Sequence, residues 1–327
     1  MKKLIVVTDR ITDPKVERDI LGDEYRVVFL PDYKGIERNQ ILSEAVGLLV
    51  WHELISKDFL DLTVNCKMIM RYGAGFDNID LEVAKRKGIV VCNTPDYGVD
   101  EVADTACAFI LNAVRQIRGY EKRLNEGDDF WGAPSDSPLK RTSEHKLGIV
   151  GMGRIGTSVA RKMQAFGMSV AFYDPYVARG YEKSIGVKRV EDLKTLQEFS
   201  TIISLHCPLT AETKGIVDKT FLAYLNPNTI LINTARGGLV SNLDVLHDGL
   251  VSGKISFIGF DVLPAEPAVI TEEPLRSWMT DKRFISRVSI TPHTAYYSEE
   301  AYSELRIKAA KNLVRYFHGL EPINRLA

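Results

Sequence analysis

The sequence has few cysteines and no strong charge of either sign. Its 327 residues include four cysteines, and none of them stands in a Cys-x-x-Cys pair. This usage is typical of reduced thiols in a protein core, so we expect neither disulfides nor a bound metal. The formal net charge is -1 without a basic block. We therefore expect no nucleic acid and no anionic membrane surface as a partner.

Long apolar runs are missing as well. The first apolar residues are interrupted by Asp9 and Arg10 before a signal-peptide core could form, and no run approaches the length of a membrane span. We expect a cytoplasmic protein without a membrane anchor. The chain is long enough for two domains, and an apolar fraction of 45% suffices for a large core.

A glycine motif stands in the middle of the chain. A Gly-x-Gly-x-x-Gly pattern follows a short apolar run, residues 147–150, and precedes apolar residues at helical spacing. In a dinucleotide fold these glycines allow a tight turn, bring the backbone close to a pyrophosphate and let the helix pack against the strand. The helix N-terminus would face the phosphates with unpaired N–H groups. The residues expected at the cofactor here are Gly151, Gly153, Arg154, Ile155 and Gly156.

An acidic residue follows the motif at the expected distance. Asp174 ends the next apolar strand, about 20 residues on, where a carboxylate accepts hydrogen bonds from the ribose hydroxyls. The same carboxylate would repel a 2′-phosphate, so the sequence favours NAD over NADP. Arg179 lies a few residues further on and could pair with a phosphate, which leaves NADP open. The glycine pattern alone also occurs at ordinary tight corners, but strand, helix and acid in register favour a dinucleotide site.

Residues 4–100 alternate short apolar strands with helical stretches, which indicates a small α/β domain. Arg71 closes one of these strands. Together with backbone N–H groups in the following glycine turn, at Ala74 and Gly75, it could hold a small carboxylate. A plain turn with a surface arginine is the alternative. His52 follows another strand, and a hydrogen-bonded core histidine fits that position at least as well as a functional one. The expected strands cover residues 4–7, 26–29, 47–51, 68–71 and 89–91.

The segment before the glycine motif shows one long helical pattern over residues 99–125, which becomes highly charged toward its end. We expect it to form a connector helix between the domains. The loop at residues 130–138 is rich in helix breakers, and its exposed apolar residues could serve a subunit contact.

The second half of the chain repeats one arrangement, in which polar residues with Pro or Gly follow an apolar strand. The strands are expected at residues 201–206, 229–234, 257–262 and 288–290. A parallel sheet places the carboxyl ends of its strands along one edge. We therefore expect four side chains to converge there, beside the nicotinamide: Arg236, Asp261, Glu266 and His293.

This combination suits hydride transfer to a 2-keto acid. Histidine titrates near neutral pH, so His293 is the expected acid, with Glu266 as its supporting carboxylate. Arg236 would bind the substrate carboxylate and polarise the keto oxygen, because a guanidinium is always charged and presents its N–H donors in a fixed fork. Asp261 would face the nicotinamide carboxamide. Each residue also has a structural interpretation: Arg236 could pair a helix end, Glu266 could cap a turn and His293 could be structural.

These residues resemble a known family, the D-isomer-specific 2-hydroxyacid dehydrogenases. The arginine, glutamate and histidine signatures of that family look like Asn233-Thr-Ala-Arg-Gly-Gly-Leu-Val240, Asp261-Val-x-x-x-Glu-Pro267 and Thr291-Pro-His293. The match covers nearly the whole chain. It implies a Rossmann-type doubly wound parallel sheet that binds NAD and a smaller, flavodoxin-like α/β substrate domain. It also implies Arg236, Glu266 and His293 as the catalytic set.

Within the family, the likeness is closest to the C-terminal-binding protein branch. It is carried by Gly73-x-Gly-Phe-Asp-Asn-Ile-Asp80, Phe172-Tyr-Asp-Pro-Tyr176, Leu205-His-Cys207 and Pro292-His-Thr-Ala-Tyr-Tyr-Ser-Glu299. The resemblance implies Cys207, Thr234 and Ala235 near the cofactor and Arg71 at the substrate carboxylate. Tyr296 stands where that branch carries a tryptophan. A bulky aromatic residue there could wall the pocket, so we expect an apolar or sulfur-containing 2-keto acid rather than phosphoglycerate. A core role for Tyr296 fits nearly as well.

The resemblance also implies a split substrate domain, residues 1–99 with 295–327, around an NAD-binding domain of residues 100–294, and a homodimer built around the connector helix. The alternative from another class is an NAD(H)-sensing scaffold or co-repressor in which turnover is incidental. The expected elements run almost from end to end of the sequence, so we expect no tail for partner recruitment and favour the enzyme. A hydrolase with tightly held NAD would need metal or cysteine chemistry that the sequence does not show.

Overall fold

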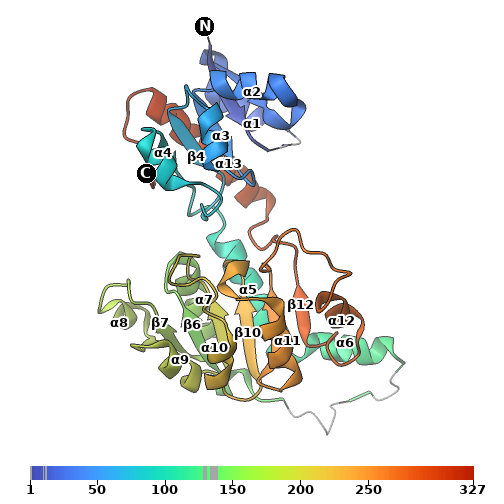
Figure 1. Ribbon diagram of the computed structural model, residues 1–327. Coiled ribbons are helices and arrows are strands. Elements are labelled where there is room, and N and C mark those ends of the chain that lie inside the picture. Colours follow the sequence, from blue (N-terminus) through green and yellow to red (C-terminus); the bar gives the residue numbers. More distant parts are fainter. Residues whose placement is uncertain (1, 10, 12, 128–130, 133–138) are drawn as a thin grey trace. The chain divides into compact units, whose positions relative to one another are not determined.

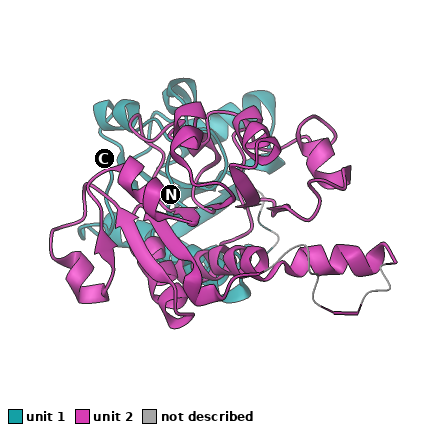
Figure 2. Ribbon diagram, turned by 90° about the horizontal axis from the view of Figure 1, so that it is seen from below, with its two compact units in different colours: residues 1–98, 297–327 teal, residues 99–296 magenta. Residues whose placement is uncertain are grey.

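The computed structural model describes residues 2–9, 11, 13–127, 131–132 and 139–327 (Figure 1). The chain divides into two compact units (Figure 2). The split unit consists of Met1–Gly98 and Tyr297–Ala327, and the central unit of Val99–Tyr296. These bounds differ by one or two residues from the domains expected from the sequence. None of the described helices combines the length and the apolar character that crossing a bilayer requires.

The split unit contains a parallel sheet whose described strands follow the order β2-β1-β3-β4-β5. This is the flavodoxin-like order, which reverses between β1 and β3. Side chains alternate between the two faces: Leu4 and Val6 belong to one apolar cluster, Ile5 and Val7 to the other. A strand buried on both faces needs such a continuous apolar run. The strands are β1 (Lys3–Val7), β2 (Tyr25–Phe29), β3 (Gly47–Val50), β4 (Met68–Arg71) and β5 (Val90–Cys92).

Helices cover both faces of this sheet. One cluster packs under α1 and α13, and the other under α2, α3 and α4, the other described helices of this unit. In Figure 1 the last helix, coloured red, returns to lie against the blue N-terminal elements. Its first turn is capped by Ser298, whose hydroxyl accepts from the N–H of Ala301. The helices are α1 (Lys15–Leu21), α2 (Gly35–Glu44), α3 (Lys57–Leu62), α4 (Leu81–Arg86) and α13 (Glu299–Phe317).

The central unit contains a second parallel sheet, with the described strands in the order β12-β11-β10-β9-β6-β7-β8. The order reverses between β6 and β9, as in a Rossmann fold extended by one strand. The expected fold class is therefore confirmed. The strands are β6 (Lys146–Val150), β7 (Ser169–Tyr173), β8 (Lys188–Arg189), β9 (Ile202–Leu205), β10 (Thr229–Asn233), β11 (Ile255–Phe260) and β12 (Val288–Ile290).

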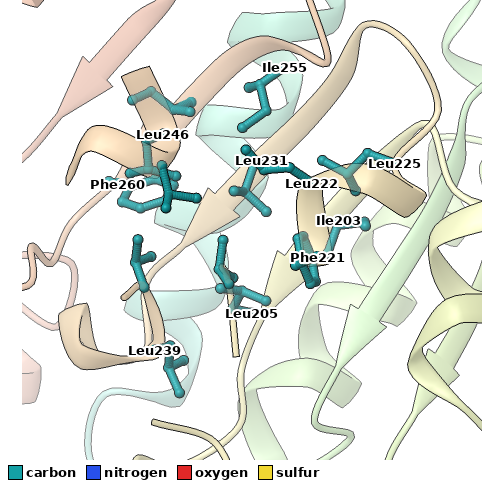
Figure 3. Close-up of a cluster of buried hydrophobic side chains, with 14 of the residues drawn as sticks. Ile203, Leu205, Phe221, Leu222, Leu225, Leu231, Leu239, Leu246, Ile255 and Phe260 are labelled. Carbon is teal, nitrogen blue, oxygen red and sulfur yellow. The ribbon is translucent and has the colours of Figure 1, made fainter. Parts of the chain in front are cut away.

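Two apolar clusters hold the central sheet between helical layers. On one face, Leu231 and Phe260 from the strands pack against Phe221 and Leu246 from the helices (Figure 3). The other face packs mainly against two helices, Val99–Arg115 and Arg154–Ala165. The sheet is thus buried on both sides, and its carboxyl edge is left for a ligand. The helices are α5 (Val99–Arg115), α6 (Ile117–Asn125), α7 (Arg154–Ala165), α8 (Tyr181–Ile185), α9 (Leu193–Phe199), α10 (Lys219–Tyr224), α11 (Leu243–Val251) and α12 (Leu275–Thr280).

The single connector helix expected over residues 99–125 is wrong. The helix breaks at Gln116, whose φ of 51° is left-handed, and α6 starts in a new direction. Two cations of α6 then reach backbone carbonyls near β12: Arg118 donates to Ile285 at 2.6 Å and Lys122 to Lys282 at 2.7 Å. The charged end of the pattern therefore belongs to a separate helix, anchored by polar contacts. Of the loop expected next, residues 130 and 133–138 lie outside the described residues.

Candidate dinucleotide and catalytic site

The three glycines after β6 have three different surroundings. Gly151 has a φ of +93°, and a Cβ there would lie 2.5 Å from the backbone nitrogen of Cys207, at the end of β9. A Cβ on Gly156 would lie 2.2 Å from the carbonyl oxygen of Gly151. A Cβ on Gly153 would meet no described atom within 4 Å. Gly151 thus makes the tight turn and Gly156 the close helix packing, whereas Gly153 faces open space, which fits a pyrophosphate beside the backbone.

The α7 N-terminus is available to an anion. Among the described residues no side chain caps it, and the first residues, Gly153 and Arg154, are exposed while Ile155 is half-buried. Unpaired N–H groups at a helix N-terminus together with the helix dipole favour a phosphate. The residues present therefore fit a dinucleotide.

Asp174 lies just past the end of β7 and joins two loops. Its Oδ2 accepts from the N–H of Met152 in the glycine turn at 2.8 Å, and its Oδ1 from the N–H of Tyr176 at 2.9 Å. The carboxylate therefore fixes the glycine turn against the loop after β7. An ionised carboxylate has lone pairs for about four donors, so a ribose hydroxyl can still be accommodated. Its ribose contact stays a prediction.

Two arginines flank this loop, and sequence reasoning missed one of them. The side chain of Arg189, only 10% exposed, donates to the carbonyls of Asp174 and Val177, both at 3.1 Å. It makes the loop a rigid platform. Arg179, which could have served a 2′-phosphate, is paired with Glu191 through two contacts of 3.0 Å. No local sequence pattern marked Arg189 as part of the site, because its strand, β8, is only two residues long.

The carboxyl end of β9 is followed by a half-buried histidine, His206, and a buried thiol, Cys207. Burial raises the pKa of the Cys207 thiol to about 11, so the thiol stays protonated at neutral pH. Burial lowers the pKa of His206 to about 3, and its Nε2 pairs with the Ser204 hydroxyl at 2.8 Å. Thr234, just past β10, is buried, and its hydroxyl has no hydrogen-bond partner among the described residues. All four cysteines are buried and unpaired, as expected.

Arg236 lies in a turn after β10 that several hydrogen bonds hold together. The amide of Asn233 accepts from the N–H of Ala235 at 3.0 Å and donates to the carbonyl of Arg236 at 2.9 Å. The guanidinium donates to the carbonyl of Ala235 at 2.8 Å. At Gly237, a Cβ would lie 1.8 Å from the carbonyl oxygen of Leu263. The turn after β10 therefore packs directly against the loop after β11.

Glu266 and His293 form the central contact of the site. Nδ1 of His293 lies 2.7 Å from Oε2 of Glu266, and Oε1 of Glu266 accepts from the N–H of Leu263 at 2.8 Å. Burial by itself would raise the pKa of Glu266, but these hydrogen bonds and the nearby charges of His293 and Arg236 lower it. The carboxylate is therefore ionised at neutral pH. The structure brings together three of the four side chains expected to converge. Glu266 and His293 are hydrogen-bonded to each other, and the positive charge of Arg236 is close enough to lower the pKa of Glu266.

Asp261 anchors the loop that contains His293. It is buried, and its carboxylate accepts from the Thr291 hydroxyl at 2.5 Å, the N–H of Thr294 at 2.8 Å and the N–H of Ala295 at 3.0 Å. Its carbonyl also accepts from the N–H of His293 at 2.8 Å. Asp261 thus holds the loop that presents the histidine, which has a left-handed φ of 56°. A contact with the nicotinamide stays a prediction.

Tyr296 follows the same loop. Its ring is half-buried, and it is the last residue of the central unit. The preceding Ala295 is buried and bonded to Asp261, so the position of Tyr296 is set by the anchor that also sets His293. Its role as a pocket wall stays a prediction.

In the split unit, Arg71 ends β4 and folds back over its own glycine turn. Its guanidinium donates to the carbonyl of the next residue, and a Cβ on Gly73 would collide with it at 1.5 Å. Asn93 holds the turn by donating to the carbonyl of Ala74 at 2.6 Å. Ala74 is exposed and Gly75 half-buried. The turn is therefore built around the arginine, and its contact with a substrate carboxylate stays a prediction.

The interpretation of His52 as a core histidine is wrong. Strand β3 ends at Val50, and the His52 side chain is 70% exposed. Its Nδ1 lies 3.1 Å from Oδ1 of Asp9, and its ring stacks on Trp51 with the centroids 4.9 Å apart. The hydrogen bond that we expected is present, but at the surface.

No group of three or more His, Cys, Asp or Glu side chains in the described part of the chain could hold a metal ion. The fold and the site together define a protein with a dinucleotide-binding domain that carries an acid–base pair at its sheet edge. Residues 107–295, more than half of the chain, match the D-isomer specific 2-hydroxyacid dehydrogenase, NAD binding domain. The chain belongs to this family, and its cofactor is a nicotinamide dinucleotide.

Two curated relatives illustrate the range of the family. C-terminal-binding protein 1 from Caenorhabditis elegans is 32% identical over 316 residues, which cover 95% of this chain and 42% of the relative. D-3-phosphoglycerate dehydrogenase from Methanocaldococcus jannaschii is 33% identical over 265 residues, which cover 81% of this chain and 48% of the relative. The chain thus spans less than half the length of either relative.

Two solved structures match nearly the whole chain. D-lactate dehydrogenase from Aquifex aeolicus, complexed with NAD and lactic acid, is 28% identical with a TM-score of 0.83 and covers 97% of this chain and 96% of that one. NADPH-dependent glyoxylate/hydroxypyruvate reductase from Sinorhizobium meliloti, complexed with NADP and malonate, is 29% identical with a TM-score of 0.84 and covers 100% and 97%. Similar chains therefore use either dinucleotide.

Proposed function

We propose that this protein is an NAD-dependent D-2-hydroxyacid dehydrogenase that interconverts a 2-keto acid and a D-2-hydroxy acid. The observation that carries the proposal is the 2.7 Å contact between His293 Nδ1 and Glu266, at the carboxyl edge of the sheet that contains the dinucleotide motif. When bound, the dinucleotide supplies or accepts the hydride at C2 of the substrate.

The contact with Glu266 assigns the two ring nitrogens of His293. An ionised Glu266 accepts a hydrogen bond from Nδ1–H, which leaves Nε2 to exchange a proton with the substrate oxygen. In the reductive direction, protonated His293 donates from Nε2 to the developing alkoxide, and the nearby carboxylate stabilises the cationic ring. In the oxidative direction the neutral ring takes the hydroxyl proton. The side chain of His293 is 44% exposed, so it is accessible to a substrate.

Arg236 is proposed to grip the substrate carboxylate and polarise the keto oxygen, because its turn is fixed by Asn233 and Gly237. Arg71, with the backbone at Ala74 and Gly75, is the proposed second carboxylate contact. We propose an apolar or sulfur-containing 2-keto acid, on the ground that Tyr296 is bulky and is held by the same loop as His293.

NAD is the proposed form of the cofactor. Asp174 places a carboxylate at the end of β7, where a 2′-phosphate would be repelled, and Arg179 is engaged by Glu191. We also propose that Thr234, Cys207 and Asp261 contact the cofactor. The homodimer, the cytoplasmic location and the substrate role of the split unit remain predictions of the sequence.

The test is NADH oxidation by the purified protein against 2-keto acids with methyl, branched, methylthio and phenyl side chains. His293→Ala should lower kcat by about a thousandfold, the usual contribution of a general acid, while NADH still binds. His318→Ala, an exposed histidine paired with Glu24, is the matched control and should leave kcat unchanged. Tight NADH binding without turnover of any keto acid would contradict the proposal and favour an NAD(H)-sensing scaffold.

A further inference from the structure

A hydrogen bond joins two loops on opposite sides of the glycine turn. The phenol of Tyr176, in the loop after β7, donates to Oε2 of Glu212, in the loop after β9. In the sheet, β6 lies between β9 and β7. The Tyr176–Glu212 bond therefore passes from one neighbour of β6 to the other, at the edge where β6 leads into Gly151 and Gly153.

Both ends of this bond are rigidly held. The N–H of Tyr176 donates to Asp174 at 2.9 Å, and Arg189 holds the same loop by donating to the carbonyl of Asp174. On the other side, the Thr213 hydroxyl donates to the carbonyl of Pro208 at 2.6 Å, which closes the turn that contains Glu212. The bond therefore links two preformed turns rather than two free side chains.

The tyrosine ring is not part of the core. It is 78% exposed, although large aromatic rings usually bury much of their surface. The hydrogen bond to Glu212 raises the pKa of the phenol, so the phenol remains protonated and stays the donor. Asp174 connects this loop to the glycine turn by accepting from the N–H groups of both Tyr176 and Met152. In that turn a Cβ on Gly153 would meet no described atom within 4 Å.

We infer that Tyr176 and Glu212 form a clasp across the adenosine half of the dinucleotide site and slow the release of the cofactor. In this fold the acid after the second strand binds the adenosine ribose. Asp174 holds that position here, and Tyr176 is two residues away. A dinucleotide that enters or leaves between the two loops has to break the clasp. The inference concerns cofactor binding and does not depend on the proposed keto acid.

The test measures NADH dissociation from the full chain by stopped-flow fluorescence, with an equilibrium titration beside it. Tyr176→Phe removes only the hydroxyl, and Glu212→Ala removes the acceptor. Each should raise the dissociation rate about fivefold, the effect of losing one net hydrogen bond, and the double variant should release NADH no faster than either. Glu212→Gln keeps an acceptor oxygen and should stay close to the wild-type rate.

Tyr224→Phe is the matched control, because Tyr224 is another partly exposed tyrosine, at the end of α10. It should leave the rate unchanged. Thermal unfolding of all variants should coincide with the wild type, since both clasp residues are exposed. Unchanged release from Tyr176→Phe and Glu212→Ala overturns the inference, and so do additive effects in the double variant or a Glu212→Gln variant as fast as Glu212→Ala.

Discussion

Both parallel sheets of the molecule are doubly wound, but they differ at the point where the strand order reverses. In the central unit, β6 leads into a glycine turn whose middle residue, Gly153, faces open space. In the split unit, β1 leads into Asp9, whose carboxylate accepts from the N–H of Trp51 at 3.0 Å and the N–H of His52 at 2.9 Å. Both crevices lie outside the carboxyl ends of strands, where such folds bind ligands.

The difference shows that topology alone does not make a dinucleotide site. Asp9 satisfies the N–H groups after β3 that a bound anion would otherwise need, and its negative charge would repel a phosphate. The central crevice instead offers an uncapped helix N-terminus, which attracts one. We therefore expect the residues after the first strand, Asp9 in one sheet and the glycine turn in the other, to decide which sheet binds the cofactor.

The largest expected effect breaks the glycine turn itself. Gly151→Ala would force a side chain into a left-handed backbone and against the backbone of Cys207, 2.5 Å away. We expect the free energy of unfolding to fall by about 3 kcal/mol or more, measured by urea denaturation. Gly153→Ala, with no described atom in its way, is the control and should unfold like the wild type. Equal stability of the two variants would contradict this account of the turn.

A smaller effect is expected in the split unit, where the ionised Asp9 carboxylate stabilises the fold. Burial by itself would raise the pKa of Asp9, but hydrogen bonds from His52, Thr8 and backbone N–H groups lower it from 3.8 to about 2. The folded-state pKa is depressed, so the stabilisation is present above about pH 4 and is lost as the pH falls toward 2. We expect it to be about 1 to 2 kcal/mol, because part of the site is open to water.

Asp9→Asn should remove this dependence. Urea unfolding of wild type and variant at pH 5 and pH 3 measures it: the stability gap between the two proteins should narrow at the lower pH. A gap of the same size at both values would show that the Asp9 carboxylate does not stabilise the split unit as described.

The smallest effect concerns the form of the dinucleotide. Glu191→Ala would release the guanidinium of Arg179, which two 3.0 Å contacts now engage. We expect NADPH to bind about threefold more tightly, since exposed ion pairs contribute little, and NADH to bind as before. Adding Arg179→Ala should abolish the gain. If the gain persists, Arg179 is not its source.

The sequence predicted the backbone of the central unit well, because its signals are local. Gly151 and Gly156 each answer to a steric requirement at one position, and strands of a parallel sheet are recognised as continuous apolar runs. The pairing of Glu266 with His293 also followed from strand ends meeting at one edge. These features need no knowledge of distant partners beyond the fold class.

The features that escaped prediction depend on distant or unmarked partners. The hydrogen-bond donors to the Asp261 carboxylate lie about 30 residues later in the chain, where no local pattern shows them. His52 follows an apolar strand, and only Asp9, 43 residues earlier, explains its surface position. The helix break at Gln116 carries no glycine or proline to mark it. Arg189 required the short strand β8 to be placed against β7.

The central claim is that the crevice of the central unit alone binds the dinucleotide. Titration of the full chain with NADH, followed by protein fluorescence, tests it most directly. We predict one NADH per chain, a dissociation constant raised at least about tenfold by Gly153→Ala, and no change with Asp9→Asn. NADH binding that is unaffected by Gly153→Ala, or that is weakened by Asp9→Asn instead, would contradict the account.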